Sequence, residues 1–406
     1  MRLAVFTNQF PGRVNTFFAR DIGPLLKAGV NIEIFPFYPL EPNLWSHVPE
    51  ILRNGAFSRN DIHYVNLGQA VRAAVLSRPT MLGRFLYDTA VIGTSAARFG
   101  VEPFGKSLYV ALKALVWAQQ SGKNYDHILA YWGNYAATSA YIFRRLINQD
   151  IPFSIFLHAG IDLYENPVYL KQKLLAADKI ITCSEFNRQF VQQHFSQIYS
   201  LIENKIYVHY HGVDLSEFRF QPDGRPAGNI LAIGGLFEYK GFDYLLRAAK
   251  ELSDRGVNYK IELIGDGDEG DSLRALAWQL GIADRVTFLG WVAPEEVPNR
   301  MQRATILVHP SSRLADGVPN VIKEAMAVGT PVVASAVAGI PELLGNGQYG
   351  TLVPPKNVYA LANAIEALLA KEDLRLRYAY EARKHAEEKF DVWRNGRQLA
   401  ELFMAT

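Results

Sequence analysis

Two carboxylates, Asp316 and Glu324, lie eight positions apart around a predicted helix start in RLADGVPNVIKEAMAVGTPVVAS, residues 313–335. Pro319 suits the first turn of that helix because its missing N–H would have had no partner there, and Gly329 marks the helix end. The preceding loop therefore faces unpaired backbone N–H groups, which Asp316 can cap. An unpaired charge inside an apolar helix is costly, so Glu324 predicts either bonds to ligand hydroxyls or a salt bridge.

A second set of candidate residues follows the ends of predicted strands. In GGLFEYKGFDYLL, residues 234–246, a strand ends in Gly234 and Gly235, and Lys240 precedes the next helix. A glycine turn, free backbone donors and a cation at a helix N-terminus are typical of an anion site, although a solvated lysine is the alternative. His158 follows the apolar strand FSIFLH and is expected at the carboxyl edge of another sheet.

Other motifs are interpreted as structural. GDGDEG, residues 265–270, fits a dinucleotide fingerprint, but its acidic side chains would repel a pyrophosphate and no Lys or Arg offsets them. Asp266 and Asp268 also imitate a metal-binding D-x-D, yet a plain acidic turn explains the pattern as well. The single cysteine, Cys183, lies in the apolar run KIITCS, which predicts a buried, unreactive thiol. Neither zinc-ligand spacing nor a G-x-S-x-G elbow is found in the sequence.

Strand and helix signals alternate along most of the chain, which predicts an α/β fold with two parallel sheets covered by helices. The polar stretch 214–228 is expected to link the two domains. The predicted domains are 1–215 and 216–389, with a C-terminal helix, 390–406, packing back on the first. Ligands should bind at the carboxyl ends of the strands, in a crevice between the domains. The expected strands are 2–8, 31–37, 128–131, 153–158, 179–184 and 206–211, then 229–235, 259–265, 285–290, 306–310, 331–335 and 349–354.

The composition excludes several classes of protein. A chain of 406 residues with 49% hydrophobic residues, 20% charged residues and a net charge of +2 is long enough for two globular domains, and it indicates neither disorder nor a nucleic-acid partner. The start of the chain reads as a β-strand rather than a signal peptide, and no apolar run reaches the roughly 18 residues of a spanning helix. One cysteine indicates a reducing compartment, so we expect a cytoplasmic protein.

Segment 66–125 is basic, with aromatic and aliphatic residues between the charges. This composition predicts either peripheral contact with an anionic membrane, on its cytoplasmic face, or helices with solvated basic faces. Its charged residues are Arg72, Arg78, Arg84, Arg98, Lys106, Lys113 and Lys123 against Asp88 and Glu102.

Several ordered blocks between about residues 150 and 390 resemble the retaining glycosyltransferases of family 4. These blocks are HAGID, ADKIITCSEF, KIYVHYHGVDLSEF, GGLFEYKGF, LIGDG, VTFLGWV, HPSS through VVAS, and GIPEL. The E-x7-E signature of that family corresponds to Asp316-x7-Glu324. The N-terminal NQFPGRVNTFF is similar to the subgroup that builds colanic acid and related exopolysaccharides. The resemblance implies the GT-B architecture, two Rossmann-like domains with parallel sheets facing across a cleft.

The resemblance also implies roles for individual residues. Asp316 and the following amides would take the hydroxyls of the donor sugar, and Glu324 those of the ribose, because carboxylates form strong charge-assisted bonds to polyols. Lys240 would meet the diphosphate and replace a metal ion, so no metal or other cofactor is expected. The base would lie near Val292, and His158 would approach the sugar from the acceptor side. His158, Lys240 and Asp316 are the predicted catalytic residues.

Two departures from the family pattern affect this site. The first acid is Asp316 rather than the usual Glu, so its reach is shorter. The phosphate-binding Arg of the family is replaced by Gly235, for which Arg313 is either a substitute or an ordinary surface charge. The predicted donor-binding residues are Gly234, Gly235, Lys240, Val292, Arg313, Asp316, Gly317, Val318, Pro319, Asn320 and Glu324, and the acceptor-side residues are Asn15, Thr16 and His158.

The reaction expected from the resemblance is transfer of a hexose from a UDP-sugar, with UDP-glucose as the first candidate, to a hydroxyl of a polysaccharide or lipid-linked glycan. The anomeric configuration would be retained. Two alternatives stay open. Gly235 makes a non-catalytic scaffold that binds nucleotide sugars plausible, and the same architecture serves epimerases and phosphorylases.

Overall fold

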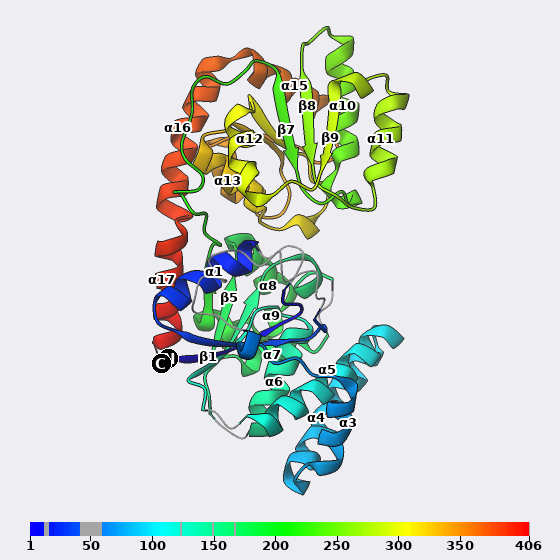
Figure 1. Cartoon of the computed structure of the whole chain (residues 1–406), viewed down its shortest axis with the longest axis vertical. Coiled ribbons are helices and arrows are strands. Elements are labelled where there is room, and N and C mark those ends of the chain that lie inside the picture. Colours follow the sequence, from blue (N-terminus) through cyan, green and yellow to red (C-terminus); the bar gives the residue numbers. More distant parts are fainter. Residues whose placement is uncertain (12–15, 41–58, 122–123, 148–149, 166–167, 406) are drawn as a thin grey trace. The chain divides into compact units, whose positions relative to one another are not determined.

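The computed structural model describes residues 1–405 apart from 12–15, 41–58, 122–123, 148–149 and 166–167 (Figure 1). Its contacts divide the chain into two compact units. Unit 1 consists of Met1–Tyr210 and Trp393–Thr406, and unit 2 consists of His211–Val392. Each unit is built on one six-stranded sheet, and all strand pairs in both sheets are parallel. The chain therefore passes between the units close to both predicted boundaries.

Unit 1 carries its sheet in the order β2-β1-β3-β4-β5-β6. The strands are almost continuously apolar because helices cover both faces of the sheet. Phe6 and Phe35 stack in the core with ring centroids 4.8 Å apart, and Trp117 packs edge-on against both rings. The strands are β1 (Arg2–Thr7), β2 (Asn31–Pro36), β3 (His127–Ala130), β4 (Phe153–Leu157), β5 (Lys179–Thr182) and β6 (Ile206–Val208), and the helices beside them are α1 (Thr16–Lys27), α6 (Tyr135–Ile147), α7 (Leu170–Ala176), α8 (Glu185–His194) and α9 (Ser196–Ile202).

The basic segment 66–125 forms three helices, α3 (Leu67–Leu76), α4 (Pro79–Ala97) and α5 (Val101–Gln120), which lie together beside α6 (Figure 1). Not all of its charges reach the surface. Lys113 is fully buried, and its ammonium donates to the Phe37 carbonyl oxygen at 2.5 Å. Burial lowers the pKa of Lys113 to about 8. Lys113 therefore contributes to neither a membrane-facing nor a solvated basic surface.

Unit 2 carries the sheet order β12-β11-β10-β7-β8-β9. Strands β8 and β9 follow β7 on one side of it. The next strand, β10, pairs with the other side of β7, and β11 and β12 continue the sheet from there. The loops after β7 and β10 therefore leave a topological switch point, where ligands of open α/β sheets bind. The strands are β7 (Asn229–Ile233), β8 (Lys260–Ile264), β9 (Val286–Gly290), β10 (Ile306–His309), β11 (Val332–Ser335) and β12 (Thr351–Val353), and the helices are α10 (Phe242–Asp254), α11 (Gly270–Gln279), α12 (Val297–Arg303), α13 (Asn320–Val328), α14 (Ile340–Leu343), α15 (Val358–Ala370) and α16 (Glu372–Lys389).

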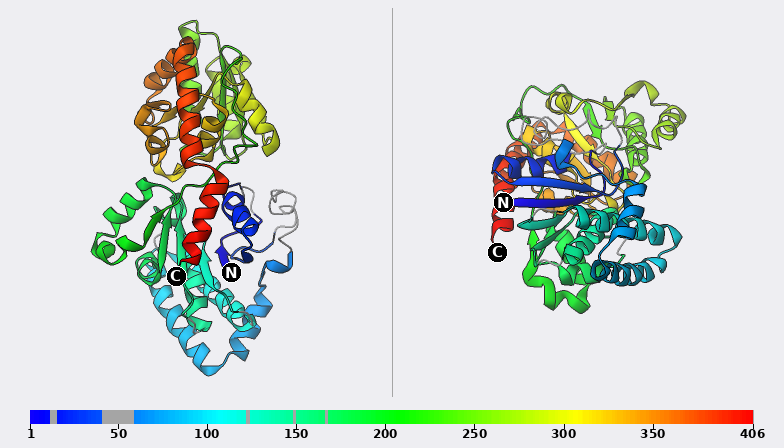
Figure 2. Two further views of the ribbon diagram at one scale, coloured as in Figure 1. Left: turned by 90° about the vertical axis from the view of Figure 1, so that its left-hand side faces the viewer. Right: turned by 60° about the horizontal axis from the view of Figure 1, so that its bottom comes forward.

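The last helix, α17 (Val392–Met404), packs on unit 1 beside α1 (Figure 2). Gly396 permits this close approach, because a Cβ there would lie 2.1 Å from the Pro24 Cβ of α1. The Phe403 ring lies 4.8 Å from the His127 ring at the start of β3. The Lys179 ammonium donates to backbone carbonyls near the end of the helix. Fixed contacts thus hold the C-terminal segment against unit 1.

The stretch 214–228, which we expected to link the domains, belongs to unit 2 and is fastened to it. The Arg225 guanidinium donates to the carbonyls of Met301 and Ala304 at 2.6 and 2.8 Å, at the C-terminal end of α12. It also donates to the Gln221 carbonyl at 2.7 Å. Carbonyls in the last turn of a helix have no intrahelical partner, and the arginine supplies one. The chain passes between the units just before this stretch, at Tyr210 and His211.

Candidate functional site

The loop after β7 is held in place by the loop after β8. The Gly234 N–H donates to the Ile264 carbonyl at 3.0 Å. Gly265 has a φ of +141°, and a Cβ there would lie 1.9 Å from the Gly234 carbonyl oxygen, so only glycine fits. This glycine of the GDGDEG motif thus serves backbone packing, which agrees with our rejection of a dinucleotide site. Its effect is to position the loop that carries Lys240.

Lys240 and Asp316 meet at the carboxyl edge of the sheet, one on the loop after β7 and the other on the loop after β10. The Lys240 ammonium donates to Asp316 Oδ1, and both side chains are largely buried, at 14% and 3% exposure. Burial raises the pKa of the Asp316 carboxyl, but the Lys240 ammonium and His309 outweigh burial and hold that pKa well below its usual range. The carboxylate is therefore ionised and neutralised in place by Lys240.

His309 completes this group, and our sequence reasoning missed it. It is the last residue of β10, is almost fully buried, and holds Nε2 at 2.5 Å from Asp316 Oδ2. The Ser311 hydroxyl donates to the same carboxylate oxygen. The signal was present in the sequence, since ILVHP places a histidine at the carboxyl end of a strand, as FSIFLH does for His158.

Helix α13 begins at Asn320, with Pro319 one position earlier than predicted, at the N-cap. Glu324 lies in the second turn and is 9% exposed. The loop before the helix is tied down, because the Gly317 carbonyl accepts a hydrogen bond from the Gly339 N–H at 3.1 Å. Val318, the next residue, is half-buried. The helix N-terminus and Asp316 thus lie on one short, fixed segment.

Gly235 lies on the loop after β7, which carries Lys240, and Arg313 lies on the loop after β10, which carries Asp316. The Arg313 guanidinium lies 2.5 Å from the Glu238 carboxylate, in a pair whose side chains are 55% and 73% exposed. An exposed pair of this kind contributes little and is easily exchanged. At Gly235, a Cβ would lie 2.6 Å from the ring of Phe237 but would approach no backbone atom that closely. The backbone of Gly235 does not have a positive φ. Neither conformation nor a backbone contact therefore requires glycine there.

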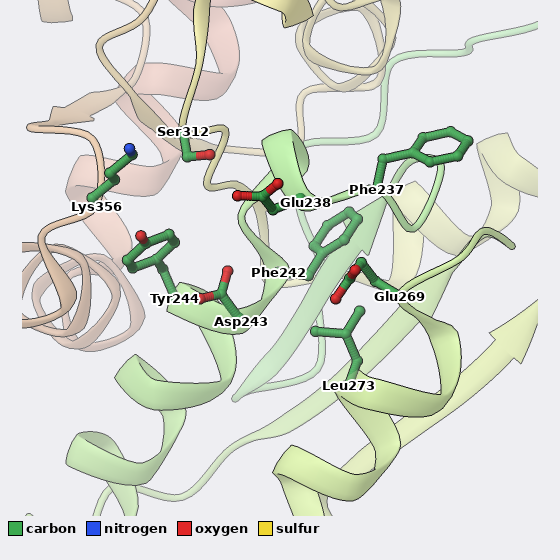
Figure 3. Close-up of a pocket in the computed structure, with 9 residues that line it drawn as sticks. All are labelled: Phe237, Glu238, Phe242, Asp243, Tyr244, Glu269, Leu273, Ser312 and Lys356. Atoms are coloured by element: carbon green, nitrogen blue, oxygen red, sulfur yellow. The ribbon is translucent and has the colours of Figure 1, made fainter.

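A pocket of about 190 Å³ lies beside the loop after β7 (Figure 3). Its lining includes Glu238 and Ser312, from the loops that carry Lys240 and Asp316 respectively. Three carboxylates line it, which disfavours a diphosphate there. Val292 is half-buried and follows β9, next to the exposed Trp291. The pocket residues are Phe237, Glu238, Phe242, Asp243, Tyr244, Glu269, Leu273, Ser312 and Lys356.

In unit 1, His158 directly follows β4 at the carboxyl edge of the sheet, as predicted. Its ring is buried among aromatic rings, with centroids 4.5 Å from Phe156 and 4.5 Å from Trp132. Its Nδ1 lies 3.8 Å from the Asp162 carboxylate. The His158 carbonyl accepts a hydrogen bond from the buried Cys183 thiol at 2.9 Å, so the predicted buried thiol is confirmed.

The loops around His158 are fixed by two buried charges. The Asp162 carboxylate accepts from the backbone N–H groups of His158, Ala159 and Gly133 at 3.0, 3.0 and 3.1 Å. The Lys173 ammonium donates to the Gly133 carbonyl at 2.7 Å. Burial lowers the pKa of Lys173 to about 7, and the nearby Asp162 opposes that shift. The sequence signal for these anchors was weak, because neither residue follows a strand directly.

The structure thus brings most predicted donor-site residues into one region of unit 2, and His158 and Thr16, two of the predicted acceptor-side residues, lie in unit 1. Thr16 is half-buried at the start of α1, and Asn15 lies outside the described residues. Within the described part of the chain, no three His, Cys, Asp or Glu side chains gather as a metal-ligand set. Over the same residues, no helix is both long and apolar enough to cross a membrane.

The sequence of this chain is similar to those of known glycosyltransferases. Residues 220–385, nearly all of unit 2, match the family described as glycosyl transferases group 1. The chain is 33% identical over 208 residues to the putative colanic acid biosynthesis glycosyltransferase WcaL of Escherichia coli, a match that covers 50% of this chain and 51% of WcaL. For the relatives matched at 32–34% identity, the chain spans about half of their length. The amylovoran biosynthesis glycosyltransferase AmsK of Erwinia amylovora is 26% identical over 426 residues, with 99% of each chain covered.

Solved structures extend the likeness to the whole fold. The chain aligns with the crystal structure of Anabaena HepE in complex with UDP-glucose at a TM-score of 0.69 and 20% identity, covering 100% of this chain and 99% of that chain. At this identity the likeness concerns the fold. The predicted fold class is confirmed, because two parallel six-stranded sheets covered by helices form the α/β architecture of the GT-B glycosyltransferases.

Proposed function

We propose that the chain is a retaining glycosyltransferase of family 4, which transfers a hexose from a UDP-sugar to a hydroxyl of a polysaccharide or lipid-linked glycan. One observation carries the proposal. A buried Lys240–Asp316 pair lies at the switch point of the unit 2 sheet, on the segment that leads into α13. The names of WcaL and AmsK favour exopolysaccharide synthesis, and the UDP-glucose complex of HepE makes UDP-glucose the first donor to test.

The donor would be bound by side chains and amides rather than by a metal ion. Lys240 and the free N–H groups at the start of α13 supply positive charge for the diphosphate. Glu324 accepts the ribose hydroxyls, and the loop at Val292 borders the base. We propose that no metal is needed, because an ammonium and oriented amides stabilise the developing phosphate charge in the way a cation does.

In the transfer step, the bond between the anomeric carbon and the phosphate oxygen breaks, and a bond to the acceptor oxygen forms on the same face of the sugar. The departing phosphate oxygen takes the acceptor proton, so the configuration is retained and UDP leaves. Asp316 binds the sugar hydroxyls, and His158 contacts the sugar from the acceptor side.

A lipid-linked acceptor would require the enzyme to work at a membrane surface, and we propose that α3, α4 and α5 make this contact. Apolar side chains are exposed on these helices and in the turn between α4 and α5, and the same segment carries exposed arginines. Such a mixture suits the boundary between anionic headgroups and acyl chains. The exposed apolar residues are Val75, Leu86, Tyr87, Phe99, Val101 and Phe104, and the exposed arginines are Arg72, Arg78, Arg84 and Arg98.

A panel of nucleotide sugars tests the donor assignment. Titration with UDP, GDP, ADP and their glucose and mannose derivatives should give the tightest binding for the UDP compounds, with equal affinity in EDTA and in magnesium. A large loss of affinity in EDTA would contradict the metal-free site. Binding without UDP release in the presence of a lipid-linked glycan would favour the alternative that Gly235 suggests, a non-catalytic scaffold. Release of a free epimerised or phosphorylated sugar would indicate an epimerase or phosphorylase.

A further inference from the structure

The two oxygens of the Asp316 carboxylate are held by different kinds of partner. Oδ2 is bonded by His309 and Ser311, two buried residues at and just after the end of β10. Oδ1 is bonded by Lys240, which lies on another loop and reaches the carboxylate through a long side chain. One oxygen is thus fixed by short side chains of its own segment, and the other is held by a flexible partner.

The hydrogen-bonding role of each His309 ring nitrogen follows from its surroundings. Its Nδ1 is buried and has no hydrogen-bond partner among the described residues. A buried N–H without an acceptor is costly, so the proton belongs on Nε2, which donates to Asp316. Ser311 Oγ lies 3.1 Å from the same nitrogen. His309 and Ser311 therefore both donate to the carboxylate and orient it, while Lys240 bonds its other oxygen.

We propose that His309 and Ser311 are positioning residues that keep Asp316 fixed while Lys240 exchanges the carboxylate for the donor diphosphate. This inference rests on the proposed function. Without donor, the Lys240–Asp316 pair leaves no uncompensated charge in a buried site. When the diphosphate takes Lys240, Oδ1 is released and accepts a sugar hydroxyl, while Oδ2 stays in place. Asp316 is thus available to the sugar only once the diphosphate has bound.

The exchange predicts that Asp316 affects the affinity for UDP and the affinity for UDP-glucose differently. UDP alone takes Lys240 but leaves Oδ1 without a partner, whereas UDP-glucose fills that position with a hydroxyl. The carboxylate therefore opposes UDP binding more than it opposes UDP-glucose binding. Asp316→Asn removes this opposition, and we expect UDP to bind about tenfold more tightly to the variant than to the wild-type protein, while transfer falls.

The positioning role is tested with His309→Phe, His309→Gln and Ser311→Ala, by measuring kcat, KM for UDP-glucose and Kd for UDP. Phe removes the donor, whereas Gln can place an N–H near the position of Nε2. We expect His309→Phe to lower kcat at least tenfold with the Kd for UDP changed less than twofold, and His309→Gln to restore most of the rate. Ser311→Ala removes a single hydroxyl, a smaller change to the packing than either His309 variant, and should lower kcat several-fold.

His127→Phe is the matched control, because His127 is equally buried but lies at the start of β3 in unit 1. Its kcat should match that of the wild-type protein. Equal kcat for the Phe and Gln variants of His309, or tenfold weaker UDP binding by Asp316→Asn, would overturn the inference. A wild-type protein that neither binds nor turns over UDP-sugars would overturn the proposed function instead.

Discussion

The change Gly235→Arg tests how the site binds phosphate. The family that this chain resembles has arginine at this position. The structure indicates that the backbone at residue 235 can accept a side chain. Gly235 lacks a positive φ, and its missing Cβ would meet only the ring of Phe237, which is 42% exposed. That ring stacks on Tyr239 with centroids 5.9 Å apart, so it must shift, and its exposure allows the shift toward solvent. We therefore expect a cost of less than about 1 kcal/mol in the free energy of unfolding.

The gain in binding should exceed that cost. A guanidinium that reaches a phosphate oxygen forms a charge-assisted hydrogen bond worth about 1.5–3 kcal/mol. Because 1.4 kcal/mol corresponds to a factor of ten, UDP should bind Gly235→Arg roughly ten times more tightly or better. Isothermal titration measures the affinity, and thermal melting measures the stability cost.

Two controls separate charge from shape. Gly235→Gln adds a side chain of similar length without the charge, and we expect it to leave UDP affinity within twofold of the wild-type value. Gly265→Ala makes a small change at a glycine that the backbone does require, and it should lower the melting temperature far more than Gly235→Arg does. Equal affinity of the Arg and Gln variants for UDP would refute the assignment of Gly235 to the phosphate site.

Three further outcomes are expected. Glu324→Ala should weaken UDP binding by roughly tenfold or more, because it would remove the proposed charge-assisted bond to the ribose; unchanged titration would exclude that role. Burial lowers the folded pKa of Lys173 to about 7, whereas an unfolded lysine titrates near 10.4. Between these values the unfolded state binds more protons than the folded state, so the contribution of Lys173 to the free energy of unfolding rises with pH. Lys173→Met removes this group, so the free energy of unfolding in urea should increase less from pH 7 to pH 9 than it does for the wild-type protein. Val101→Asp should reduce sedimentation with anionic vesicles, whereas Trp278→Asp, on a side chain of unit 2 that is also largely exposed, should not.

Much of the fold could be predicted from the sequence because parallel strands buried on both faces appear as short apolar runs. Each predicted strand has a counterpart in the structure, and the residues that follow the strands, such as His158 and Gly234, lie at the carboxyl edges as expected. The first acid of the signature was found by its spacing. These signals are local, so each can be recognised within a few residues.

The remaining features depend on contacts between distant segments. Lys240 and Asp316 are 76 residues apart, and nothing near either one predicts that each neutralises the other. His309 looks like an ordinary strand end until its Nε2 is seen beside the carboxylate. Arg225 lies in the stretch predicted to be the linker, because its acceptors, carbonyls at the C-terminal end of α12, are about 80 residues further along the chain. Long-range pairs of this kind are visible only once the sheet order is known.

The most direct test of the central claim is release of UDP from UDP-glucose, followed with and without a lipid-linked glycan, in the wild-type protein and in Lys240→Met. Our account predicts UDP release that depends on the glycan, with a glucosylated product in which the α-configuration of the donor is retained, and a loss of at least a hundredfold in Lys240→Met. UDP release by Lys240→Met at the wild-type rate, or binding of UDP-glucose without glycan-dependent release by the wild-type protein, would contradict it.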